Sequence, residues 1–193
     1  MSEQAKQSTL DFPEKSHRNT EKLYEWDEVR EMLDKQIKRR AEYVTAVIEA
    51  MVERFGEEAY DVAEEAIYQI GYRKGKARAE HVKEQGEEPN FESLAELIAH
   101  EMSRLYLGTT TEVDSNKLIV RETYCPLPVY WKSAGLPDTQ IVRYCRIFDQ
   151  VDKGMIEGYN VQFEPRLGGA EQLATQGYCQ MVVMQKGFSE EEG

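Results

Sequence analysis

The sequence predicts an α+β protein in which long N-terminal helices pack on a mainly antiparallel sheet, with two short helices inserted between strands. The first observation behind this prediction is that apolar residues recur every three or four positions between residues 26 and 105, as in helices that bury one face. The second is that β-branched runs separated by turn residues begin at Thr109. Helices that precede the strands, rather than alternating with them, favour an antiparallel sheet.

The length of the chain favours one domain. A chain of 193 residues can bury one core and is too short for two ordinary domains. We expect a single domain over residues 21–187. Residues 1–20 are polar and show no apolar periodicity, which predicts a disordered N-terminal tail, and residues 188–193 form an acidic tail.

Three helices are expected before the sheet. Gly56 supplies a natural end for the first, and a break near residues 38–40 is an open alternative. Gly71 and Gly75 lie on one side of the second. Glycine costs about 1 kcal/mol in a helix interior, so the pair favours close packing on another helix, with a ligand lying on this side as the alternative. The expected helices are Trp26–Phe55, about 57–85 and about 90–105, the last one capped by Asn90.

The sheet is expected to begin with a hairpin. β-branched runs lie on either side of Asp114-Ser115-Asn116, which is typical of two strands joined by a turn. Further along, Tyr159, Val161 and Phe163 alternate as in a strand. The other expected elements are helices over about 126–134 and 138–153 and a last strand over 178–185.

Charge and cysteine content exclude several classes of protein. The 36 acidic and 24 basic residues give a net charge of -12, which opposes binding to nucleic acid or to an anionic membrane. No apolar run approaches the roughly 20 residues that span a bilayer, and the N-terminus lacks the apolar core of a signal peptide. Three widely spaced cysteines suit a reducing compartment. We therefore expect a soluble, cytoplasmic protein with no nucleic-acid or membrane partner.

Cys125 is the first candidate for chemistry. It ends a strand-like run and precedes Pro126, which suits the first turn of a helix because its missing N–H would be unpaired there. The unpaired N–H groups and the dipole at a helix N-terminus favour the thiolate. We therefore expect the pKa of Cys125 to lie below the free value of about 8.5.

A second candidate group lies on the expected helix over 138–153. Cys145 and Asp149 are four residues apart and share one face, with Asp152 on the same side. Burial would raise the pKa of Asp149 and make it a proton carrier, whereas a nearby negative charge would make the Cys145 thiol harder to ionise. A core cysteine beside a solvated aspartate is the alternative. Zinc held by cysteines is another, although no pair has C-x-x-C spacing, and no other cofactor is expected.

Five short segments carry a family resemblance: Cys125-Pro126, Ala134-Gly135-Leu136-Pro137, Cys145 with Asp149, Glu157-Gly158-Tyr159-Asn160, and Cys179. Together they resemble the family of L-2-amino-thiazoline-4-carboxylic acid hydrolases. The chain departs from that pattern at Val161, where a proline is expected, and at Thr175-Gln176-Gly177-Tyr178, where a Gly-Asp pair is usual. More distantly, the order of helices and then sheet is similar to ligand-binding domains of the 4-vinyl-reductase type, a likeness of fold alone.

The resemblance implies a hydrolase that opens a small cyclic amidine or amide-type ring, such as 2-aminothiazoline-4-carboxylate, by adding water or a thiolate to the carbon between ring nitrogen and sulfur. Cys125 would attack or orient the substrate, Asp149 would carry protons, and Arg166 would pair with a carboxylate. The implied catalytic residues are Cys125, Cys145, Asp149, Cys179 and Glu122, and the substrate-binding residues are Asn160, Arg166, Tyr124 and Trp131. A noncatalytic, sensor-like ligand-binding domain and a metal or redox cysteine protein stay open as alternatives, as does a homo-oligomer.

Overall fold

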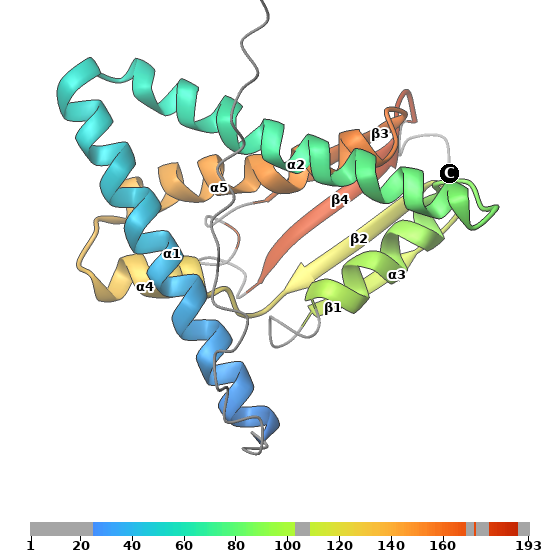
Figure 1. The fold of residues 1–193 in the computed structure, drawn as a ribbon, viewed down its shortest axis with the longest axis horizontal. Coiled ribbons are helices and arrows are strands. Elements are labelled where there is room, and N and C mark those ends of the chain that lie inside the picture. Colours follow the sequence, from blue (N-terminus) through green and yellow to red (C-terminus); the bar gives the residue numbers. More distant parts are fainter. Residues whose placement is uncertain (1–24, 103–108, 169–171, 173–177, 189–193) are drawn as a thin grey trace, which may run out of the picture.

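The computed structural model describes residues 25–102, 109–168, 172 and 178–188, which form five helices and four strands (Figure 1). The predicted α+β class is confirmed, with long helices before the sheet. The tail expected over residues 1–20 lies outside the described residues, as do residues 189–193 of the acidic tail. The elements in order are α1 (Trp26–Phe55), α2 (Glu58–Glu84), α3 (Phe91–Met102), β1 (Thr109–Val113), β2 (Lys117–Glu122), α4 (Pro126–Ser133), α5 (Asp138–Tyr159), β3 (Phe163–Leu167) and β4 (Cys179–Gln185).

The ends of the first helices follow local sequence signals. α1 ends at Gly56, whose φ of 81° lies in the left-handed region that favours glycine. The break considered near residues 38–40 is absent, since α1 runs through this lysine and arginine segment, whose residues are good helix formers. Asn90 caps α3, and its Oδ1 accepts a hydrogen bond from the backbone N–H of Ser93 at 2.9 Å.

The prediction of a strand that starts at Tyr159 is wrong. α5 continues past its expected end near residue 153 to Tyr159, and β3 begins only at Phe163. The buried side chains of Ile156 and Tyr159 continue the inward face of α5 at helical spacing, and this burial outweighs the short alternating pattern. The second of the two helices between the strands is therefore long rather than short.

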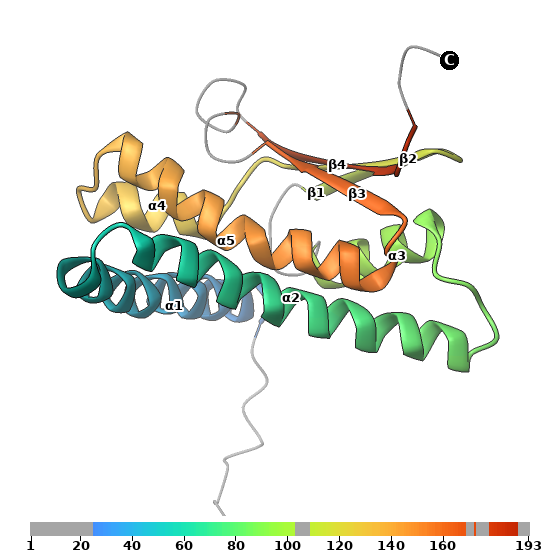
Figure 2. The same cartoon turned by 90° about the horizontal axis from the view of Figure 1, so that it is seen from above.

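Glycines let α2 and α5 pack backbone to backbone. A Cβ atom at Gly71 or Gly75 would overlap backbone carbonyl groups of α5, and one at Gly154 or Gly158 would overlap those of α2. The two helices run side by side in both views (Figures 1 and 2). The prediction that Gly71 and Gly75 serve helix packing is confirmed, because the backbone of α5 occupies the place where a ligand would have to lie.

The strands form one antiparallel sheet in the order β1-β2-β4-β3. Asp114 closes the predicted hairpin, since its Oδ1 accepts hydrogen bonds from two backbone N–H groups of the turn at 2.8 and 2.9 Å. Figure 2 shows the helices gathered on one side of the sheet, with α5 running along it. The other side of the sheet carries no helix among the described residues.

The core consists of two clusters of buried apolar side chains. The sheet cluster lies between the sheet and α2, α3 and the second half of α5, and the helix cluster joins α1, α2 and α4 to the first half of α5. The sheet cluster includes Leu94, Ile98, Leu118, Val120, Ile156, Phe163, Met181 and Val183. The helix cluster includes Ala41, Ile48, Trp131, Ile141, Tyr144, Cys145 and Ile147.

Candidate functional site

A cavity of about 290 Å³ lies where the two clusters meet. Val120 and Met181 of the sheet cluster line it, and so do Cys145 and Phe148 of the helix cluster. Most of its remaining wall is apolar. The side chains on the wall that can carry chemistry are Arg40, Lys74, Glu122, Cys125, Cys145, Asp149, Asp152 and Cys179. All three thiols of the chain therefore face one space.

The sheet contributes a carboxyl and a thiol that lie opposite each other. In the register of β2 and β4, Val120 pairs with Met181 and Glu122 pairs with Cys179. Because side chains alternate along a strand, Glu122 and Cys179 lie on the same face as the apolar pair. Opposed residues of an antiparallel pair have Cβ atoms about 4.5–5.5 Å apart. The apolar face of the sheet thus ends in a polar pair at the cavity.

α5 contributes the opposite side of the cavity. Phe148 and Asp149 lie three and four residues after Cys145, and Asp152 lies three residues after Asp149, so these residues share one face of the helix. Ile141 and Ile156 are buried on the same helix before and after them. The two carboxyls therefore interrupt an otherwise apolar stripe, and their catalytic roles stay predictions.

Cys125 lies at the start of α4, as expected, but its pKa does not have the expected direction. Pro126 is the first residue of the helix, and the Cys125 side chain forms no capping hydrogen bond there. Burial raises the pKa of the Cys125 thiol well above its ordinary value, the backbone N–H of Leu127 lowers it by less, and Glu122 and the other two thiols raise it further. The prediction of an activated thiolate is wrong, because a single N–H does not replace the lost hydration.

Glu122, Asp149 and Asp152 form what we call the acid cluster. Burial raises the pKa of Glu122 to about 7, with further contributions from Asp152 and Asp149. Burial and the charge of Asp152 raise the pKa of Asp149 to about 7, and burial raises that of Asp152 to about 6. No hydrogen bond or ion pair links any of the three to the part of the chain that the structure describes. At neutral pH the cluster therefore holds both protonated and ionised carboxyls.

Two cationic side chains complete the wall. Arg40 comes from α1 and Lys74 from α2, and both are exposed, which places them where the cavity meets solvent. Neither side chain has a hydrogen-bond or ion-pair partner within the described ranges. The three carboxyls of the acid cluster are half-buried, so the cations are the more exposed charged groups of the cavity wall.

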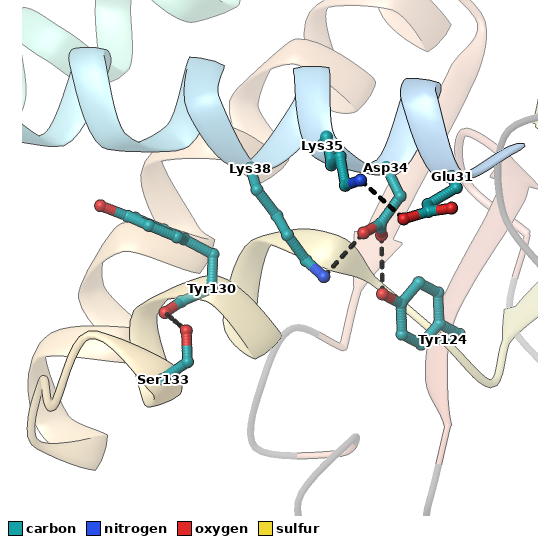
Figure 3. Close-up of polar contacts among 7 residues, drawn as sticks. All are labelled: Glu31, Asp34, Lys35, Lys38, Tyr124, Tyr130 and Ser133. Atoms are coloured by element: carbon teal, nitrogen blue, oxygen red, sulfur yellow. Dashed lines mark hydrogen bonds and ion pairs between the residues drawn. The ribbon is translucent and has the colours of Figure 1, made fainter. Parts of the chain in front are cut away.

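Tyr124 and Trp131, which were expected to bind substrate, do not line the cavity. The Tyr124 hydroxyl donates to Asp34 Oδ1 at 2.7 Å, and Lys38 Nζ lies 2.7 Å from Asp34 Oδ2 (Figure 3). Trp131 is fully buried, and its Nε1 donates to Thr45 Oγ1 at 3.0 Å. Both side chains hold α1 against the segment that carries Cys125.

Asn160 and Arg166 also lie away from the cavity wall. Asn160 Nδ2 donates to the carbonyl oxygen of Pro89 at 2.9 Å, and its Oδ1 accepts a hydrogen bond from the backbone N–H of Gln162 at 3.0 Å. Arg166 is exposed on β3, on the opposite face from its neighbour Leu167, which does line the cavity. Asn160 therefore organises the α5–β3 connection, and Arg166 is not placed to contact a ligand in this cavity.

Arg40 and Lys74 were not among the residues that the sequence indicated. Arg40 follows the buried Ile37 by three positions, and Lys74 lies between Gly71 and Gly75, so each flanks the inward face of its helix. The sequence feature that could have indicated them is a charged residue next to the inward face of a helix. Periodicity alone does not distinguish it from a solvated surface cation.

No group of three or more His, Cys, Asp or Glu side chains within the described residues is arranged to hold a metal ion. No helix in the same part of the chain is long and apolar enough to cross a bilayer.

The structure is thus that of an α+β protein with its thiols and several carboxyls gathered in one cavity. The chain belongs to the L-2-amino-thiazoline-4-carboxylic acid hydrolase family, whose model matches residues 36–177. The match takes in α2 and most of α1 as well as the Cys125 region, and it ends two residues before Cys179, so the family correspondence of that cysteine stays a prediction.

The chain was also compared with curated proteins and with solved structures. No curated protein matches the chain. Among solved structures, the chain is similar to the crystal structure of a trafficking protein particle complex subunit 3 from Naegleria fowleri covalently bound to palmitic acid. That likeness has 16% sequence identity and a TM-score of 0.49, and it covers 78% of this chain and 95% of the other.

Proposed function

We propose that this protein hydrolyses a small cyclic amidine such as 2-aminothiazoline-4-carboxylate. The observation that carries the proposal is that the thiols and the acid cluster face one cavity in a member of this hydrolase family. The cavity volume of about 290 Å³ is at the small end of ligand pockets, which suits one substituted five-membered ring.

Asp149 is the group best placed to start the reaction. As a carboxylate with a pKa of about 7, it accepts a proton from water while the water oxygen bonds to the carbon between ring nitrogen and sulfur. The ring C=N bond becomes a single bond, and its nitrogen takes up a proton. In the collapse of the tetrahedral intermediate the new hydroxyl loses its proton and becomes C=O, the C–S or ring C–N bond breaks, and the leaving sulfur or nitrogen takes up a proton.

Glu122 supplies the second proton transfer. Its pKa of about 7 lets it stay protonated beside an ionised Asp149, so one carboxyl can act as base while the other acts as acid. The two come from different elements, β2 and α5, on opposite sides of the cavity. This arrangement supports attack on one side of the ring and protonation of the leaving group on the other.

Cys125 is assigned to positioning rather than to attack. Its raised pKa keeps it a neutral thiol near pH 7, and a neutral thiol is a weak nucleophile. The first turn of α4 beside it offers one backbone N–H, that of Leu127, because residues 126 and 128 are prolines. This donor and the helix dipole favour the negative charge of the tetrahedral intermediate. Water activated by Asp149 is therefore the favoured nucleophile.

Turnover of 2-aminothiazoline-4-carboxylate at pH 7 tests the proposal. Mass spectrometry detects the product that carries one added water, and a thiol reagent tells C–S cleavage from C–N cleavage. We expect turnover by the wild type, an Asp149→Asn variant that is slower by about 100-fold or more, and no comparable loss in Asp61→Asn, an exposed control on α2.

The outcomes separate the proposed function from its alternatives. Binding of the ring by the wild type without any turnover would favour the noncatalytic ligand-binding module. Activity that disappears on dialysis against a chelator and returns with zinc would favour the alternative of a protein that holds zinc through its cysteines. Equal rates for Asp149→Asn and the wild type would contradict the assigned mechanism.

A further inference from the structure

The charges on the cavity wall are unevenly arranged. Arg40 and Lys74 lie on two different helices at the solvent side, whereas the acid cluster lies on β2 and α5 between the two apolar clusters. The two cations have no hydrogen-bond or ion-pair partner in the described part of the chain. A ligand that fills this cavity therefore meets exposed cations where the wall reaches solvent and half-buried carboxyls further in.

We propose that Arg40 and Lys74 bind the carboxylate of the substrate at the mouth of the cavity and so select cyclic amidines that carry an acid group. This inference rests on the proposed function and adds the residues that recognise the substrate. A guanidinium group presents two parallel N–H donors to a carboxylate, and an ammonium group adds a point charge. The pair takes the role that the sequence suggested for Arg166, which is exposed away from the cavity.

The same arrangement fixes the direction in which the ring enters. A carboxylate placed beside Asp149 and Asp152 would meet like charge in a site with little water, which is unfavourable. An amidine group carries N–H donors and tends to be cationic, so its favourable place is beside these acceptor carboxyls. With the carboxylate held at Arg40, the amidine carbon points inward, toward the group that we assign as the base.

The packing of α2 explains how Lys74 reaches the mouth. Gly71 and Gly75 bring the backbone of α2 against α5 next to Val151 and Met155. Lys74 lies between these glycines in the chain, and Val151 is itself part of the cavity wall. The close approach of the two helices therefore brings an exposed cation to the edge of a cavity that α5 helps to form.

Two matched ligands test the proposal: 2-aminothiazoline-4-carboxylate and 2-aminothiazoline, the same ring without the carboxylate. Their dissociation constants are measured by calorimetry with the wild type, Arg40→Gln, Lys74→Gln and the double variant, and KM and kcat are measured where turnover occurs. We expect each single change to weaken binding of the carboxylate ring by about 5- to 10-fold, with kcat and binding of the bare ring nearly unchanged. Arg40→Lys should restore part of the loss.

The control variants are Arg39→Gln and Lys76→Gln, which remove neighbouring exposed cations that do not line the cavity. Their effect on either ligand should stay below about twofold, because surface charges at a distance are screened. Melting temperatures of all variants should match the wild type, since the four side chains are exposed.

Three results would overturn the proposal: no binding of the carboxylate ring by the wild type, unchanged preference for it in the double variant, or an equal loss in the controls. Binding that depends on Arg40 without turnover would uphold the carboxylate site and contradict the hydrolysis. Turnover with unchanged preference in the double variant would uphold the hydrolysis and contradict the carboxylate site.

Discussion

Burial raises the pKa of the Cys125 thiol although the backbone N–H of Leu127 favours the thiolate, because burial of a thiolate costs more than one N–H recovers. The same environment acts on the carboxyls across the cavity, whose pKa values are also raised. At a given pH the Cys125 thiol and these carboxyls are therefore more protonated than the same groups in water. The position of an ionisable residue in the fold, and not its local motif, decides its protonation state.

Alkylation measures the state of the Cys125 thiol. We expect iodoacetamide to modify Cys125 more slowly at pH 7 than it modifies a free cysteine peptide, with a rate that still rises above pH 9, because only the thiolate reacts. Peptide mapping by mass spectrometry gives the rate at each cysteine, and Cys125→Ser identifies the signal. Faster reaction of Cys125 than of the peptide at pH 7 would show that the helix N-terminus outweighs burial.

Asp152 should make the folded state less stable as the pH rises. Its folded pKa of about 6 lies above the ordinary value of 3.8, so folding favours the protonated form. The stability that protonated Asp152 contributes to the fold is lost as the pH rises from about 4 through 6, and this loss is complete above that range. Asp152→Asn should therefore raise stability at pH 8 by about 1–2 kcal/mol, a value discounted because the side chain is only half-buried, and should have little effect at pH 4.

Thermal melting at the two pH values checks this prediction, with the exposed Glu80→Gln variant as control. The expected shift at pH 8 is about 2–8 °C for a protein of this size. A variant that melts lower than the wild type at pH 8 would mean that the Asp152 carboxylate stabilises the fold.

At the scale of the elements, α2 and α5 pack closely and both contribute to the cavity wall, through Lys74 and Val151 among others. Gly75→Ala would normally stabilise a helix by about 1 kcal/mol. Here its Cβ would overlap the carbonyl of Met155, so we expect a loss of about 1–3 kcal/mol, because the helices must move apart. Denaturant unfolding measures the change, and Lys76→Ala on the exposed side should be nearly neutral. A stabilised Gly75→Ala variant would contradict the close approach.

The sequence was sufficient for elements whose signals are local. Three such features are found where they were expected: the apolar repeat and end of α1, the hairpin around Asp114 and the cap at Asn90. Each depends on residues that are neighbours in the sequence. The end of α5 was not predictable in this way, because Ile156 and Tyr159 are buried against elements distant in the chain. The alternation of three apolar residues, Tyr159, Val161 and Phe163, was too short to distinguish a strand from the end of a helix.

At the scale of the whole molecule, the predicted site residues divide into two groups. Cys125, Cys145, Asp149, Cys179 and Glu122 all line one cavity, since the register of β2 with β4 and the inward face of α5 bring them there. The four residues predicted to bind substrate do not line it, because their partners are set by tertiary contacts that no motif contains. Arg40 and Lys74 were missed because helical periodicity does not distinguish a cation at the edge of a cavity from a solvated surface cation.

The pH dependence of kcat/KM for 2-aminothiazoline-4-carboxylate tests the central claim that the acid cluster, and not a thiolate, drives the reaction. One ionised and one protonated carboxyl are required, and the pKa values of Asp149 and Glu122 are both about 7. The account predicts a bell-shaped profile with its maximum near pH 7 and loss of activity on both sides. A rate that keeps rising beyond pH 9 and vanishes in Cys125→Ser would contradict it, because that is the behaviour of a thiolate nucleophile with a raised pKa.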